Sequence, residues 1–269
     1  MVTRRRVRTV VAALAAVLLS ACSAGTGTAS TTGQAGDLAV RYGPSSSHLA
    51  DVYPALGGDG PRPVVVWVHG GGWSVGSRAD VPPGVVALQE HGFHVVSIDH
   101  RPSPNVRHPE HMFDVKRAIA WIVANADERG FDPQNIFLAG HSSGGHLAML
   151  AAFSRGVAGL DRGEPAVRGV VAVAAPALLR DLFDHGDGLD LALRMYKGCD
   201  ALGPCDLGPG EPGRYLDPAD PPLLLIHGTS DMLVPVSQSR AMVELATAAG
   251  LDVQLLETPD SDLQAIVRH

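Results

Sequence analysis

Gly140-His141-Ser142-Ser143-Gly144 is the stretch of this 269-residue chain that decides its fold. An apolar run precedes it at residues 135–139, and a second run follows it at residues 146–152. Together they predict a strand, a tight turn and a helix, the context that a Gly-x-Ser-x-Gly nucleophile elbow requires. A side chain on Gly140 or Gly144 would collide with the neighbouring strand and helix, and Ser142 would stand at the positive end of the helix. The alternative is an ordinary strand-to-helix turn with a capping serine.

A second glycine-rich stretch lies far upstream. Residues 64–68 are apolar at every position, as expected of a strand that is buried on both faces, and His69-Gly70-Gly71-Gly72-Trp73 follows directly. We expect the amides of Gly70, Gly71 and Gly72, together with that of Ser143, to form an oxyanion hole. A flexible glycine turn is the alternative. Trp73 either lines an acyl pocket or fills the core.

These two motifs, in this order and spacing, resemble those of the α/β-hydrolase superfamily. The similarity is to the bacterial carboxylesterases that include hormone-sensitive-lipase-like and feruloyl-esterase-like enzymes. Residues 99–102, 131–136 and 221–231 are similar to further landmarks of that group. The resemblance covers roughly residues 38–259. It implies an α/β-hydrolase fold and the cleavage of esters through an acyl-enzyme.

By this resemblance Asp231 is the acid of a catalytic triad. It follows the apolar run 223–227, so it is also expected at the carboxyl edge of a parallel sheet, where Ser142 lies. A turn or helix-capping aspartate is the alternative. The family places its histidine after the last strand, but Leu263 stands there and the later histidine is His269. Three possibilities stay open: His269 is the base, the domain lacks a base, or another histidine is recruited.

The rest of the chain alternates between strand and helix patterns. This alternation predicts a mainly parallel sheet with helices on both faces. Residues 178–222 are rich in Gly, Pro and Asp and indicate a short, lid-like insertion over the active face. Other predicted strands lie at residues 38–42, 51–53, 93–99, 170–174 and 251–256, and predicted helices at residues 85–91, 111–125, 236–249 and 262–269.

Several polar side chains have simple structural interpretations. On the helix at residues 111–125, Asp114, Lys116 and Arg117 are interpreted as a solvated face. The remaining assignments concern histidines. His69 and His227 are expected to make structural hydrogen bonds, and His141 and His146 to support the elbow.

The N-terminal residues 1–21 have the pattern of a lipoprotein signal peptide. A basic segment at residues 4–8 precedes an apolar segment at residues 10–19. Leu19-Ser20-Ala21-Cys22 resembles the bacterial lipobox, which implies that Cys22 carries palmitate or a similar lipid. An ordinary secretory signal is the alternative. Residues 22–36 predict a flexible tether and residues 37–269 the hydrolase domain, anchored by Cys22 at the extracytoplasmic side of the cell membrane.

The composition of the chain limits the ligands and partners that it is expected to bind. The formal charge of -7 makes nucleic acid an unfavourable partner. In an exported chain Cys199 and Cys205 favour a disulfide over a metal site, and we expect neither a metal ion nor a cofactor. The predicted substrates are small-molecule esters of small or medium acyl groups. Alternatives are an amide hydrolase (an arylformamidase or a peptidase) and a noncatalytic surface lipoprotein without a base, while a membrane-surface lipase would need a larger apolar lid. No pattern indicates an oligomeric state.

Overall fold

A mostly parallel sheet organises the molecule. The computed structural model describes residues 36–182, 189–200, 204–259 and 261, and within this part the strand order is β1-β2-β4-β3-β5-β6-β7-β8. β1 pairs with β2, and β2 with β4, in antiparallel fashion. All other neighbours are parallel. The strands are β1 (Asp37–Arg41), β2 (Leu49–Tyr53), β3 (Arg62–Val68), β4 (His94–Ile98), β5 (Phe131–His141), β6 (Gly169–Val173), β7 (Leu223–Gly228) and β8 (Val253–Thr258).

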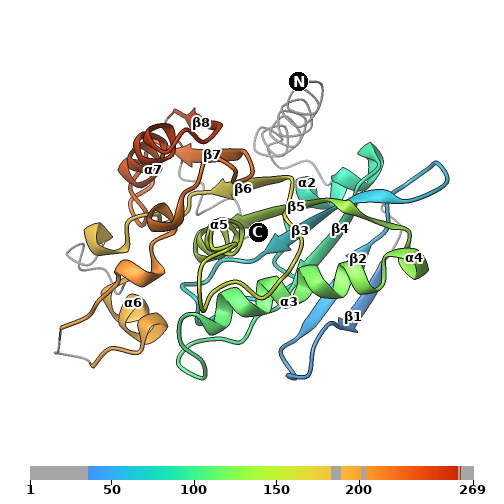
Figure 1. Ribbon diagram of the computed structural model, residues 1–269, viewed down its shortest axis with the longest axis horizontal. Helices are drawn as coiled ribbons and strands as arrows, with labels where there is room; N and C mark the ends of the chain where they lie inside the picture. Colours follow the sequence, from blue (N-terminus) through green and yellow to red (C-terminus); the bar gives the residue numbers. More distant parts are fainter. Residues whose placement is uncertain (1–35, 183–188, 201–203, 260, 262–269) are drawn as a thin grey trace.

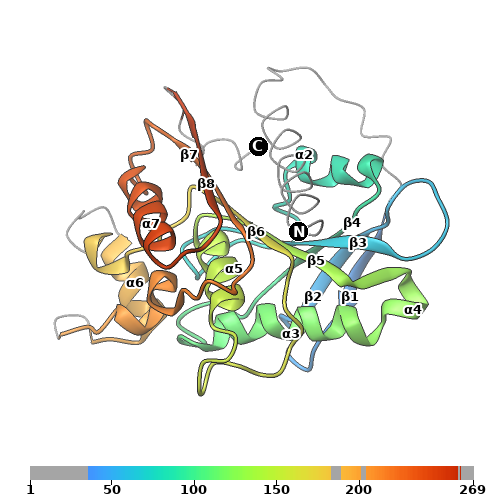
Figure 2. The same cartoon turned by 45° about the horizontal axis from the view of Figure 1, so that its top comes forward.

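Helices cover both faces of the sheet, as Figures 1 and 2 show. Among the described residues, α3, α4, α5, α6 and α7 contribute buried side chains to the hydrophobic cluster on one face, while α2 and the 3-10 turn η1 contribute to the cluster on the other. The helices are α2 (Pro83–Val86), α3 (Glu110–Ala124), α4 (Ala126–Arg129), α5 (Ser143–Phe153), α6 (Leu189–Lys197) and α7 (Ser237–Ala248). The 3-10 turns are η1 (Ala87–His91), η2 (Leu179–Leu182), η3 (Gly208–Gly210) and η4 (Pro212–Tyr215).

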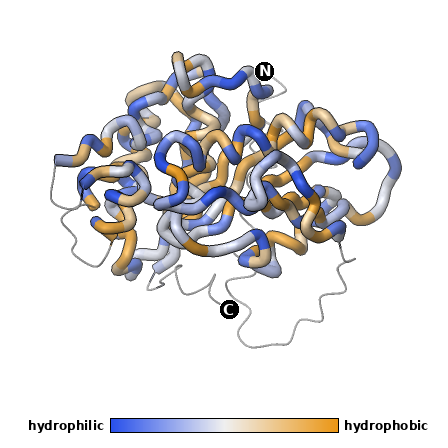
Figure 3. The backbone as a smooth tube through the Cα atoms, turned by 90° about the horizontal axis from the view of Figure 1, so that it is seen from below, coloured by the Kyte–Doolittle hydropathy of each residue, from blue (hydrophilic) through white to orange (hydrophobic). Residues whose placement is uncertain are grey.

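The central strand β3 shows why the sheet is covered on both sides. Its residues alternate between two separate hydrophobic clusters: Val64, Val66 and Val68 join one, while Val65 and Trp67 join the other. All five side chains are buried, so the uninterrupted apolar run was correctly interpreted as a doubly covered strand. Along the backbone, hydrophobic stretches alternate with hydrophilic ones (Figure 3), as the succession of buried elements and polar connections requires.

Two segments contain more regular structure than the sequence predicts. β5 begins at Phe131 rather than at residue 135, because the buried Phe131 pairs with Arg62 before the register shifts at the next positions. The segment at residues 178–222 contains helix α6 and three short 3-10 turns. In the part of the chain described above, no helix has both the length and the apolar character needed to cross a bilayer. The predicted signal peptide, Cys22, the tether and the terminal helix lie outside the described residues.

Candidate active site

Ser142 occupies the turn between β5 and α5. Its backbone adopts φ 52° and ψ -124°, a conformation that a non-glycine residue takes only when its surroundings hold it there. Its amide donates to the carbonyl of Val173 at 2.8 Å, and its carbonyl accepts from the amide of His146 at 3.0 Å. A Cβ on Gly140 would lie 2.5 Å from the Gly144 carbonyl carbon, and one on Gly144 would lie 2.1 Å from the Val68 oxygen. The turn is therefore the strained, glycine-dependent elbow that the motif predicts.

The glycine loop after β3 lies against this elbow. A Cβ placed on Gly70 would be 2.9 Å from His141 Nδ1 and 3.3 Å from the Ser142 Cβ. Gly71 and Gly72 have φ values of +117° and +59°, which favour glycine. Among the described residues, the amides of Gly71 and Gly72 donate no backbone hydrogen bond outside the regular elements. The predicted meeting of the two glycine turns is confirmed.

Asp231 follows β7 at the same edge of the sheet. One strand, β6, separates β5 from β7, so the two strand axes are about 10 Å apart. The Asp231 side chain is buried, and its Oδ1 accepts from the amides of Leu233 at 3.0 Å and Val234 at 2.9 Å. Its Oδ2 lies 3.6 Å from His227 Nε2. The carboxylate is thus held in place by its own loop, at the edge that carries Ser142.

The two histidines near the end of β7 and directly after β3, His227 and His69, hydrogen-bond groups other than the Ser142 hydroxyl. His227 Nε2 donates to the Val234 carbonyl at 2.7 Å, and its Nδ1 bonds the Ser239 hydroxyl at 2.7 Å. His69 Nδ1 hydrogen-bonds the Gly70 carbonyl at 2.8 Å. Both therefore have the structural role expected of them. Across the described ranges, no histidine hydrogen-bonds the Ser142 hydroxyl, and His269 lies outside them.

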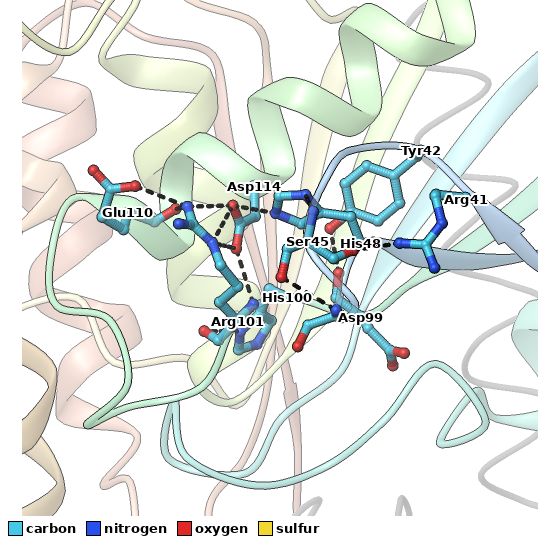
Figure 4. Close-up of polar contacts among 10 residues, drawn as sticks. Arg41, Tyr42, Ser45, His48, Asp99, His100, Arg101, Glu110 and Asp114 are labelled. Carbon is cyan, nitrogen blue, oxygen red and sulfur yellow. Dashed lines mark hydrogen bonds and ion pairs between the residues drawn. The ribbon is translucent and has the colours of Figure 1, made fainter.

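The expectation of a solvated face on α3 is wrong for two of its three residues. Asp114 is fully buried, because His48 and Arg101, from two loops, contact its carboxylate (Figure 4). His48 Nε2 lies 2.8 Å, the Arg101 amide nitrogen 2.9 Å and the Arg101 guanidinium 2.7 Å from the Asp114 oxygens. Lys116 is buried as well and pairs with Glu164. Only Arg117 is exposed. Asp114 thus anchors the loop after β4, which lies beside the glycine loop.

A group of histidines behind the site, three of them buried and His108 half-buried, was not anticipated. His108, His111 and His146 contact the ring of Tyr196, and His100 contacts His111 edge to face and stacks on His69. Burial, above all, lowers the pKa of His100 and His108 to about 3, of His111 to about 2 and of His146 to about 4. These rings are therefore neutral at physiological pH. The spacing of the buried Leu189, Leu193 and Tyr196 on α6 is helical, and this was the signal that could have predicted the element.

Cys199 and Cys205 form a disulfide with a Cα–Cα distance of 5.5 Å, as the sequence predicts. It closes a short loop immediately after α6. Over the residues that the structure describes, no group of three or more His, Cys, Asp or Glu side chains could hold a metal ion.

Comparison with known proteins places this site in a family. The family model BD-FAE matches residues 50–245. The chain belongs to the BD-FAE family. BD-FAE proteins are hormone-sensitive-lipase-like α/β-hydrolases, so the resemblance drawn from the two glycine motifs is confirmed.

Relatives of this BD-FAE chain are named esterases. Esterase LipQ of Mycobacterium tuberculosis is 33% identical over 244 residues, which are 85% of this chain and 58% of LipQ. The chain spans less than two thirds of the length of the first curated relatives that it matches.

The chain matches solved structures of the same fold over a larger share of their length than it matches LipQ. A truncated carbohydrate esterase from gut microbiota is 25% identical, with a TM-score of 0.76 over 88% of this chain and 92% of its own. Esterase B from Lactobacillus rhamnosis, at 24% identity, has a TM-score of 0.74 over 96% of this chain and 85% of its own. The α/β-hydrolase fold is therefore established.

Proposed function

We propose that this chain is a serine carboxylesterase that cleaves small or medium acyl esters. The observation that carries the proposal is the approach of the two glycine turns: Gly70 lies against Ser142, with a Cβ-to-Cβ separation of 3.3 Å for a side chain built at Gly70. A nucleophile and a row of main-chain donors are thereby brought to one point. The membership in an esterase family supports the same activity.

In the proposed reaction Ser142 Oγ attacks the ester carbonyl carbon. The carbonyl oxygen becomes an oxyanion and accepts from the amides of Gly70, Gly71, Gly72 and Ser143. The alcohol leaves with a proton that the base histidine has taken from Ser142. Water then loses a proton to the same histidine and attacks the acyl carbon; the bond to Ser142 Oγ breaks, the acid is released, and the histidine returns the proton to Oγ. Asp231 orients that histidine and stabilises its charged form.

We assign the base to His269 in this proposal. The segment after β8 passes beside the acid loop, since the Ser230 amide donates to the Ser261 carbonyl at 3.1 Å. His269 is eight positions after Ser261 in sequence, and a helical segment of eight steps spans about 12 Å. The alternative proposal is a noncatalytic α/β-hydrolase that lacks a base, with Leu263 at the position where the family carries histidine.

The acyl side is expected to be small. Helix α6 lies over the glycine loop, because a Cβ on Gly72 would be 3.6 Å from the Ala192 Cβ. Little room therefore remains on that side for a long acyl chain. Comparing p-nitrophenyl acetate, butyrate and decanoate tests this expectation, and an anilide of the preferred acyl group tests amide cleavage. We expect turnover of the two short esters, little of the decanoate, and slower cleavage of the anilide.

Three variants test the mechanism. Ser142→Ala should abolish both turnover and labelling by a fluorophosphonate. His269→Ala should abolish turnover in a protein with an unchanged melting temperature. If His269→Ala is fully active, the assignment of the base is wrong. If the wild type is inactive and Leu263→His gains turnover, the noncatalytic alternative is correct.

We also propose that the protein is an exported lipoprotein, held on the extracytoplasmic side of the cell membrane by a lipid on Cys22 and a tether at residues 22–36. The basic and apolar segments before Cys22 support this proposal. Expression of the full chain in a bacterial host with labelled palmitate should label the wild type and leave Cys22→Ala unlabelled. Equal labelling of both forms would contradict it.

A further inference from the structure

Trp73, directly after the glycine loop, is a strained residue. Its φ is 59°, in the left-handed region that bulky side chains rarely adopt, and its side chain is completely buried. A residue in this region is strained and persists only where its surroundings hold it. Two neighbouring contacts do so here. Its carbonyl accepts from the Ser103 amide at 2.8 Å, and its ring stacks on Tyr196 with a centroid distance of 4.7 Å.

The third contact of Trp73 is with His146, four residues after the nucleophile. The indole Nε1–H donates to His146 Nδ1 at 3.2 Å. Since an indole only donates, His146 Nδ1 must be the unprotonated nitrogen, and its Nε2 carries the hydrogen. Nε2–H then donates to the Gly210 carbonyl at 2.7 Å. The two partners together require one neutral tautomer of His146, which has no exposed surface.

Gly210 belongs to the insertion that carries α6. The insertion is closely packed around it, because a Cβ on Gly210 would lie 3.0 Å from Leu179 Cδ1 and 3.2 Å from Tyr196 Cε1. Tyr196 also contacts His146 edge-on at 5.5 Å. His146 thus joins three segments that are distant in sequence: the nucleophile helix, the glycine loop and the insertion.

We propose that His146 is a positioning residue for the oxyanion loop. The carbonyl of Gly210, in the insertion, fixes the orientation of the His146 ring, and the ring in turn holds Trp73 and the backbone around it. The inference rests on the proposed esterase function, because it concerns the donors of the same site. An oxyanion hole requires its donors within about 2.7–3.1 Å of the oxyanion, and a misplacement of about 1 Å can lower the rate on the order of 100-fold. Loss of either hydrogen bond of His146 allows the strained Trp73 to relax and the glycine amides to move with it.

The test compares leucine and glutamine substitutions at His146 with a leucine substitution at His94. His94 is a matched control, because it is also buried, its Nδ1 accepts from the Ala55 amide at 3.3 Å, and its Nε2 donates to the Gly130 carbonyl at 3.1 Å. It lies at the amino end of β4, away from the carboxyl edge that carries Ser142. Leucine removes both hydrogen bonds, whereas glutamine can accept and donate like the neutral ring.

We expect His146→Leu to lower kcat by about tenfold or more while KM changes less than about threefold, because donor alignment acts on the transition state. The rate at which a p-nitrophenyl phosphonate labels Ser142 should fall in parallel, since that adduct also places an oxygen on the loop. His146→Gln should recover most of both rates. His94→Leu should lower the melting temperature and leave kcat and the labelling rate unchanged.

The outcomes separate this proposal from the esterase proposal. An active wild type whose His146→Leu variant loses thermal stability but keeps kcat and the labelling rate would overturn the role of His146 alone. A wild type that is labelled but does not turn over would overturn the esterase proposal. The labelling rates of the wild type and of His146→Leu would still test the role of His146. A wild type that neither turns over nor is labelled would overturn both.

Trp73→Phe removes the same hydrogen bond from its other end and keeps the test decisive if His146→Leu does not fold. It should lower both kcat and the labelling rate, as His146→Leu does. In a double variant with His146→Gln, these rates should fall by less than the product of the two single effects. Unchanged rates in Trp73→Phe would overturn the proposal.

Discussion

Gly144→Ala is the substitution for which the structure predicts the largest effect from one added methyl group. The new Cβ would lie 2.1 Å from the Val68 oxygen and 2.4 Å from the His69 oxygen. Both are backbone atoms at the end of β3, where the oxyanion loop begins, so no side chain can rotate to make room. Since real Cβ atoms essentially never approach within 3.0 Å, the elbow and the loop must separate by about 1 Å.

A shift of about 1 Å between a nucleophile and its oxyanion donors can lower the rate about 100-fold, and forcing the added group into a packed site costs about 1–3 kcal/mol of stability. We therefore expect kcat/KM for p-nitrophenyl butyrate to fall by about 100-fold in a protein that remains folded at 25 °C. The assay is initial-rate hydrolysis, together with urea unfolding followed by circular dichroism.

Gly156→Ala is the matched control for this prediction. Gly156 has φ +75° and open space around its added Cβ, so the substitution strains the backbone without touching a neighbour. It should lower the free energy of unfolding by about 1 kcal/mol and leave kcat/KM unchanged. If Gly144→Ala retains more than about a third of the wild-type kcat/KM, the close approach of elbow and loop is not what aligns the donors.

Three further predictions concern stability. Asp114→Ala leaves the half-buried Arg101 head and the buried His48 ring without their shared acceptor and should lower the free energy of unfolding in urea by about 3 kcal/mol, whereas a loss below about 1 kcal/mol would contradict its role as an anchor. Folding lowers the pKa of His146 from 6.5 to about 4, so between these pH values the unfolded chain binds more protons than the folded chain. The contribution of His146 to the free energy of unfolding is therefore complete above pH 6.5 and is lost as the pH falls towards 4. His146→Gln should make urea stability fall less steeply between pH 6.5 and 5, and an unchanged slope would refute the assignment. Replacing both Cys199 and Cys205 by Ser should lower the free energy of unfolding by about 2 kcal/mol, because the disulfide joins residues only 6 apart in sequence; a wild-type melting temperature that does not respond to reductant would argue against it.

The strands were predictable because each carries its own pattern. Residues 64–68 are apolar without interruption, and the structure buries them on both faces. The glycines of the elbow were equally informative as a motif: a Cβ on Gly140 would clash within the turn itself, whereas a Cβ on Gly144 would clash with the backbone at the end of β3. Family membership followed from the same two motifs.

Helix α3 shows where such reasoning ends. Its apolar spacing predicts the helix, but a charged residue beside the apolar stripe is solvated or buried according to what packs over it. His48, Arg101 and Glu164 come from other parts of the chain and turn Asp114 and Lys116 into buried partners.

What the sequence by itself determined is therefore the strands, most of the helices and the elbow turn at Ser142, because these depend on residue periodicity and on glycines at fixed spacing in a motif. Tertiary structure alone decided that Trp73, His146 and Gly210 meet behind the oxyanion loop. No periodicity encodes such a meeting, since hydrogen bonds between distant segments depend on how the sheet order and the insertion bring those segments together in space.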